Sequence, residues 1–129
     1  MPRRGEPGFD ADVTQFVLHG LRSVWALEAL VLIAESAGAD WSTTRLTQEL
    51  RASLPLVEDI VRRLIAYGLL VDEGETFRFQ PASPELADLV LRTKAAYRHK
   101  PFAMISLIGR GPAALQGLAD AFRFRTDKP

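Results

Sequence analysis

The chain of 129 residues contains no cysteine, only two histidines, and no excess of charge of either sign. Without cysteine there can be no disulfide, no thiolate metal site and no cysteine nucleophile. The 16 Lys and Arg residues balance the 16 Asp and Glu residues, so no net charge draws the whole chain to nucleic acid or to anionic lipid. This balance favours a protein that recognises a specific partner, and the absence of cysteine fits a reducing compartment such as the cytoplasm.

The sequence also lacks a long apolar run. The longest, residues 24–34, spans 11 residues and contains Glu28, whereas a helix that crosses a bilayer needs about 20 apolar residues. Arg3 and Arg4 near the start are followed by Pro and Gly instead of an apolar stretch, so no secretory signal is expected. We therefore predict a cytoplasmic protein with no membrane partner.

Patterns that carry catalysis or bind metal ions are missing as well. His19 and His99 are far apart, and neither lies at metal-ligand spacing from another His or a carboxylate. We expect His19 to be a partly buried packing residue. The Gly-Arg-Gly-Pro segment at 109–112 matches no phosphate-binding loop and is expected to be a break between helices. The sequence predicts no catalytic residue, no metal, no cofactor and no enzymatic activity.

Apolar periodicity predicts a mainly α-helical chain, and capping residues indicate where the helices begin and end. Asp10 or Asp12 can cap the first helical pattern, which we expect to bend or break at Gly20 and to stop at Gly38. The expected helices cover residues 13–37, 43–52, 54–67, 83–99, 102–108 and 112–124.

The segment between the helices expected at 54–67 and 83–99 has the pattern of a β-hairpin. Phe77 and Phe79 alternate with polar residues, as a half-buried strand requires. Residues 69–71 supply the other strand, and the Asp-Glu-Gly-Glu segment at 72–75 supplies the turn. Trp41 lies in a segment too short for anything but a bridge or a brief strand.

The order of helix, short strand, helix, turn, helix and hairpin is that of a winged helix. Residues 43–80 resemble the helix-turn-helix and wing of MarR-type and related bacterial transcriptional regulators. Leu46 and Leu50 match the Leu-x-x-x-Leu spacing of their second helix, and Leu64 begins the Leu-x-x-x-Gly-Leu ending of their third. The resemblance implies a winged helix-turn-helix fold and a role in transcriptional regulation.

The resemblance covers about residues 21–82 and divides the chain into parts. We predict a flexible arm over 1–9, a winged-helix domain over 10–82, and a C-terminal helical extension over 83–129, which resembles the tails of uncharacterised bacterial proteins. MarR-type regulators dimerise through helices outside the DNA-reading part, so the resemblance implies a homodimer; the alternative is that the extension folds back onto the first helix. The interface candidates are Leu86, Leu89, Val90, Tyr97, Phe102, Met104, Ile105, Leu107, Ile108, Leu118 and Phe122.

In a winged helix that reads DNA, the third helix enters the major groove and the wing lies beside it. Glu58 and Asp59 lie where that helix would enter the groove, and the wing tip at 72–75 carries three carboxylates, which phosphates repel. Residues 41–82 hold five basic and six acidic side chains, a net charge of −1, whereas residues 83–129 hold eight and four, a net charge of +4. The candidate DNA-binding residues, all expected to face solvent, are Arg45, Leu56, Glu58, Asp59, Arg62, Arg63 and Arg78.

Two functions stay open at this point. The first is a winged-helix transcriptional regulator that contacts duplex DNA through the third helix and the wing, although the acidic residues there disfavour it. The second is a winged-helix adaptor whose acidic face binds a basic partner protein and does not bind DNA. The charge on the surface formed by the third helix and the wing discriminates between them.

Overall fold

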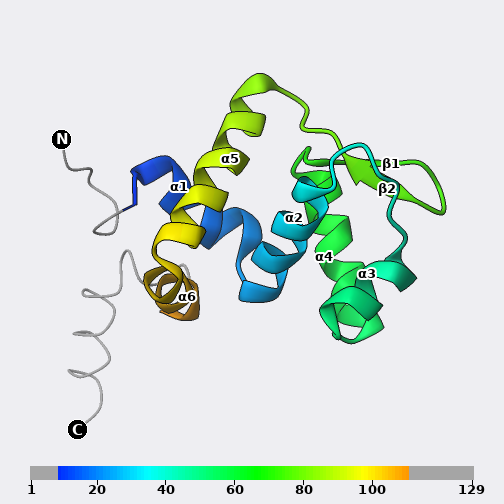
Figure 1. Cartoon of the computed structure of the whole chain (residues 1–129), viewed down its shortest axis with the longest axis horizontal. Coiled ribbons are helices and arrows are strands. Elements are labelled where there is room, and N and C mark those ends of the chain that lie inside the picture. Colours follow the sequence, from blue (N-terminus) through cyan, green and yellow to red (C-terminus); the bar gives the residue numbers. More distant parts are fainter. Residues whose placement is uncertain (1–8, 111–129) are drawn as a thin grey trace, which may run out of the picture.

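The computed structural model describes residues 9–110 and shows a winged helix followed by two further helices (Figure 1). The two strands pair antiparallel, with Leu70 opposite Phe79 and Asp72 opposite Phe77. Trp41 forms the predicted isolated bridge, because its backbone N–H donates to the Phe77 carbonyl at 2.8 Å. The predicted fold class is therefore confirmed. In chain order the elements are α1 (Ala11–Gln15), η1 (Phe16–Leu21), α2 (Val24–Glu35), α3 (Thr43–Leu50), α4 (Leu54–Ala66), β1 (Leu70–Asp72), β2 (Phe77–Phe79), α5 (Pro84–His99) and α6 (Pro101–Arg110).

Side-chain caps set where most of the helices begin. Asp10 caps α1 by accepting a hydrogen bond from the Val13 backbone N–H at 2.9 Å, which confirms one of the two predicted caps. Burial alone would raise the pKa of Asp10, but the hydrogen bonds from Val13 and from Arg92 lower it below its ordinary value. Serine caps start α2, α3, α4 and α5 in the same way, at Ser23, Ser42, Ser53 and Ser83.

The first helical region breaks two residues later than predicted. Gly20 lies inside η1, a π-helix, and the chain turns at Arg22, whose φ is 73°, before Ser23 caps α2. The helical direction bends by 107° between residues Ala11–Leu21 and Val24–Glu35. Gly20 has another purpose: a Cβ there would lie 2.9 Å from Cε2 of Tyr67, so only glycine lets that ring rest on η1.

The core is continuous from the first described residue to α6. Its centre consists of buried side chains from η1, α2 and α4, with Trp41, Leu46 and Leu69 packed around them. Phe9 belongs to it with only 4% of its surface exposed, so the prediction of a flexible arm is wrong at this residue. The rest of that arm, the predicted helix at 112–124, and the interface candidates Leu118 and Phe122 lie outside the described residues.

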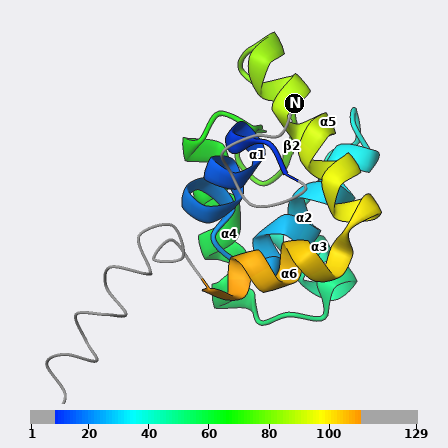
Figure 2. The same cartoon turned by 90° about the vertical axis from the view of Figure 1, so that its left-hand side faces the viewer.

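The C-terminal helices complete the same core. Figure 2 shows α5 and α6 lying against the part of the molecule formed by α1, η1 and α2. Met104, Leu107 and Ile108 are buried on the inner side of α6, and Val90 is buried on α5. These four interface candidates are therefore corrected to core residues, because the amphipathic helices turn their apolar faces onto the winged helix.

The remaining interface candidates divide into two groups. Leu86, Leu89 and Tyr97 are half-buried and pack against the core. Phe102 and Ile105, with 86% and 40% of their surfaces exposed, face solvent on α6. The expected break at Gly109 is also absent, since α6 continues through it to Arg110.

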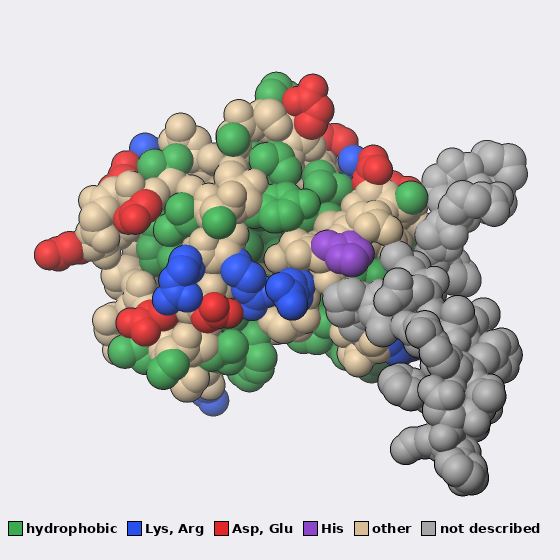
Figure 3. Space-filling view, turned by 180° about the vertical axis from the view of Figure 1, so that it is seen from behind, with side chains coloured by type: hydrophobic (Ala, Val, Ile, Leu, Met, Phe, Trp, Pro, Cys, Tyr) green, Lys and Arg blue, Asp and Glu red, His purple; other side chains and the backbone are tan. Residues whose placement is uncertain are grey.

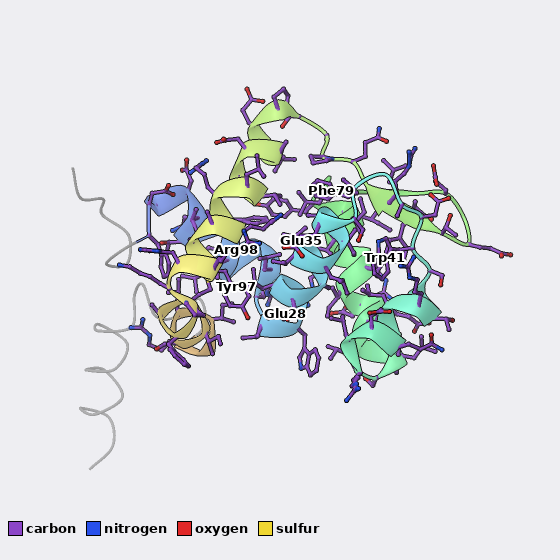
Figure 4. All side chains as sticks on the ribbon, in the orientation of Figure 1. Glu28, Glu35, Trp41, Phe79, Tyr97 and Arg98 are labelled. Atoms are coloured by element: carbon purple, nitrogen blue, oxygen red, sulfur yellow. The ribbon has the colours of Figure 1, made fainter. Side chains whose placement is uncertain are left out.

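Polar contacts fasten α5 to α2 (Figure 4). The Tyr97 hydroxyl donates to the Glu28 carboxylate. The next residue of α5, Arg98, pairs with Glu35, seven residues further along α2, at 2.9 Å. The hydrogen bond to Glu28 and partial burial raise the pKa of Tyr97 to about 12.

Within residues 9–110, no single helix combines the length and apolar character needed to cross a membrane. The bent pair Ala11–Leu21 and Val24–Glu35 meets that test only when its two halves are taken together.

The division of α6 into an inner and an outer face can be tested with two alanine substitutions. Leu107→Ala removes a fully buried side chain and should lower the free energy of unfolding by about 2–5 kcal/mol. Phe102→Ala removes a larger but exposed side chain and should change it by no more than about 0.5 kcal/mol. Urea denaturation of both variants measures the difference. A larger loss for Phe102→Ala would show that the outer face is the one that is covered.

The contact between Tyr97 and Glu28 predicts a pH dependence of stability. Because the pKa of folded Tyr97 is about 12 and its usual value is 10.0, the stability that this group contributes is fully present below pH 10. It is lost as the pH rises through 12, since the unfolded chain gives up the phenolic proton first. In urea denaturation from pH 8 to pH 12, the advantage of the wild type over Tyr97→Phe should therefore shrink. An advantage that grew with pH would contradict the assignment.

Candidate functional site

The face formed by α4 and the β1–β2 wing is the surface to which sequence analysis assigned the function. Ser53 caps α4, and Pro55 is tolerated in its first turn. Val57, Ile60 and Leu64 then point into the core at helical spacing. This arrangement leaves the opposite side of α4 in solvent. Figure 3 shows acidic and basic side chains next to one another on the rear of the molecule.

A groove of about 260 Å³ runs between α4 and the wing, and we refer to it as the α4–wing groove. Val61, Ile65 and Phe77 form its apolar floor. Its charged lining consists of three carboxylates and one guanidinium, which gives a net charge of −2 from Glu58, Asp72, Glu75 and Arg62.

The wing tip keeps its acidic side chains on the outside. Gly74, with a φ of 100°, turns the chain, and its backbone N–H donates to Asp72 at 3.0 Å. Glu73 pairs with Arg78 at 2.9 Å, so the wing's one arginine is neutralised by the wing itself. The tip is therefore electronegative where a wing that grips DNA needs positive charge.

The arginines of α4 are also paired within the chain. Asp59 accepts from Arg62 at 3.2 Å and from Arg63 at 3.3 Å, so one carboxylate lies between two guanidinium groups. Arg62 remains mostly exposed, at 71% of its side-chain surface. Solvent screens such pairs, which keeps their contribution to stability small.

Three candidate DNA-binding residues, all expected to face solvent, are only partly exposed. Arg78 on the wing keeps 35% of its side-chain surface exposed, and the other two lie on α4. Arg63 is only 28% exposed, because its Nη1 donates to the backbone carbonyl of Leu21 at 2.8 Å and joins α4 to the end of η1. Leu56 is half-buried against the core, while the neighbouring Leu54 is the exposed one. The other candidates on α4, Glu58, Asp59 and Arg62, are exposed as predicted.

Arg45, at the start of α3, lies apart from the groove. Its guanidinium carbon is 4.1 Å from the centre of the Trp41 ring, in a cation–π contact. Its Nη1 also donates to the Asp40 carbonyl at 3.4 Å. Arg45 thus covers the buried indole ring of Trp41.

Sequence reasoning missed two exposed arginines that end helices. Arg22 follows η1 and Arg51 follows α3, with φ values of 73° and 57°. No sequence signal marks them, because Gly and Asn are the residues expected in this conformation. Neither makes an ion pair with another described residue. Arg51 comes two residues before Ser53, the cap of α4, and Arg22 follows Leu21, whose carbonyl accepts from Arg63 of α4.

Residues 9–110 contain no group of three or more His, Cys, Asp or Glu side chains placed to hold a metal ion. His19 is exposed, so the prediction that it is a partly buried packing residue is wrong. The π-helical turn rotates it away from its buried neighbours Leu18 and Gly20.

The inward position of Arg63 can be tested against its neighbour. Arg63→Ala removes a charged donor from the Leu21 carbonyl and should lower the free energy of unfolding by about 1–3 kcal/mol. Arg62→Ala removes only an exposed pair with Asp59 and should cost no more than about 0.5 kcal/mol. Chemical denaturation of the two variants is the measurement. Equal effects would mean that the Leu21 contact does not stabilise the fold.

No family model matches this sequence. A search of the curated proteins also finds no match. Among solved structures, the chain is similar to the multiple antibiotic-resistance repressor MarR from Listeria monocytogenes, at 22% sequence identity and a TM-score of 0.49, over 92% of this chain and 86% of that one. A likeness at this level does not transfer a function, which must be argued from the site itself.

Proposed function

We propose that this protein is a winged-helix regulator that acts by binding a basic segment of a partner protein in the α4–wing groove. The observation that carries the proposal is the charge of this groove. Glu58, Asp72 and Glu75 line it around an apolar floor. A peptide with Lys or Arg beside an apolar side chain complements both features, since electrostatic complementarity sets partner choice and association rate.

The state of the arginines also supports protein contact over DNA contact. DNA binding draws much of its affinity from cations that neutralise phosphates. Here Arg62 and Arg63 share Asp59, and Arg78 pairs with Glu73. The carboxylate beside each of these guanidinium groups offsets its charge and would repel an approaching phosphate.

Direct contact with duplex DNA is the second candidate, and one observation favours it. Arg22 and Arg51 are exposed and make no ion pair with a described residue. With Arg62 they could supply phosphate contacts next to α4. This candidate predicts binding that weakens steeply with salt and depends on these arginines.

The two candidates separate in a binding experiment on the full chain. A fluorescent peptide of alternating Lys or Arg and Leu, and a random-sequence duplex, are titrated at low salt by anisotropy. We expect the peptide to bind more tightly than the duplex. Glu58→Gln with Glu75→Gln should weaken peptide binding by roughly threefold to fivefold per carboxylate removed. Glu49→Gln on α3 makes the same charge change outside the groove and should leave binding unchanged.

Reversing the charge of the wing tests the DNA candidate directly. Glu73→Lys with Glu75→Lys should raise the affinity for nonspecific duplex and make it more salt-dependent, because the like charge is removed. If wild-type protein instead binds duplex more tightly than peptide, and Arg22→Ala with Arg62→Ala abolishes that binding, the partner is DNA and the protein-binding proposal fails.

A further inference from the structure

A second groove shares no lining residue with the α4–wing groove. It is formed where α1, η1, the residue after α4 and the first turns of α5 meet, and its volume is about 400 Å³. This volume lies within the range of small-molecule sites, roughly 300–1,000 Å³. Its apolar lining consists of Phe16, Tyr67, Leu86 and Leu89, and we call it the aromatic groove.

Two aromatic rings are held in fixed positions in this groove. Phe16 and Tyr67 meet edge to face, with ring centres 5.3 Å apart and planes at 60°. Tyr67 is nevertheless 41% exposed. It rests on η1 at Gly20, where any Cβ would force it away. The π-helical form of η1, an uncommon conformation often found at functional sites, supplies both Phe16 and Gly20. The exposed ring is therefore a preorganised surface.

The charged lining of the aromatic groove is acidic. Asp12, Glu85 and Asp88 face a single cation, Arg92, so the lining carries a net charge of −2. Arg92 is already engaged: it bonds Asp88 at 2.8 Å and Asp10 at 2.9 Å, and it lies 3.6 Å from Asp12. Glu85 makes no ion pair with a described residue.

We propose that the aromatic groove binds a small organic cation, an ammonium group attached to an aromatic or branched apolar body. The apolar body would pack on Leu86 and Leu89. The ammonium group would lie near Glu85 and the exposed face of Tyr67, where both the carboxylate and the ring quadrupole attract it. The same carboxylates repel anionic ligands. Figure 3 shows apolar side chains exposed on the rear of the molecule, with acidic side chains above them and a row of basic side chains below them.

The size of the groove favours a small molecule over a helix of a partner protein. An α-helix with its side chains is about 10–12 Å wide. A space of about 400 Å³ holds one ring system with a short side chain, whereas a helix of that width could place only single side chains in it. This inference does not depend on the proposed partner of the α4–wing groove, since the two grooves share no lining residue.

Three probes of one shape and different charge test the proposal: 3-phenylpropylamine, 3-phenylpropanol and 3-phenylpropanoate. Each is titrated into the full-length protein by calorimetry and by two-dimensional NMR of backbone amides. We expect saturable binding of the amine, weaker binding of the alcohol and the weakest binding of the carboxylate. The shifted amides should include those of Phe16, Tyr67 and Leu86.

Matched variants decide whether the site is the one proposed. Glu85→Gln removes an exposed carboxylate and should weaken amine binding by roughly threefold to fivefold, with no change for the alcohol. Glu58→Gln in the α4–wing groove should have no effect. Tyr67→Leu should also weaken amine binding, with thermal unfolding used to check that the variant is folded. The proposal is overturned if the carboxylate binds as tightly as the amine, if Glu85→Gln leaves amine affinity unchanged, or if no probe saturates.

Discussion

The packing of α4 against η1 is the constraint on which the rest of the structure depends. At one end of this contact the Tyr67 ring rests on the bare backbone of Gly20, and one turn earlier Arg63 donates to the Leu21 carbonyl. These contacts bring the end of η1 close to the third turn of α4. They decide which side of α4 faces solvent, and they take one of its two arginines out of the exposed face.

The same contact determines the electrostatic character of the molecule. Arg63 is turned inward and is also paired with Asp59. The charge of the α4–wing groove is therefore dominated by the carboxylates of Glu58, Asp72 and Glu75. The protein therefore has the shape of a winged helix, but the charge of its α4–wing groove attracts cations. Under the proposed function, the distribution of charge over the fold selects the partner, and its shape alone does not.

Sequence patterns predicted the order of elements, the cap at Asp10 and the half-buried strand at Phe77 and Phe79, because periodicity and capping are local properties. They failed where long-range contacts decide. Gly20 looked like a helix breaker, yet it serves a contact with Tyr67, 47 positions later in the chain. Arg63 looked like Arg62, and only the approach of Leu21 separates them. Likewise, no pattern could distinguish an apolar face that binds another molecule from one that covers its own domain, as α6 does.

The burial of Phe9 and Ile108 in one core has a consequence for how the chain folds. The two residues are separated by nearly the whole described length, so the core cannot close until α6 is available. During synthesis, a nascent chain that had emerged only as far as the wing would still expose the surfaces of η1 and α2 that α6 later covers. Such surfaces attract chaperones and favour aggregation. The winged helix therefore depends on a segment outside its own motif, and the rate of its final folding step is set by contacts that are distant in sequence.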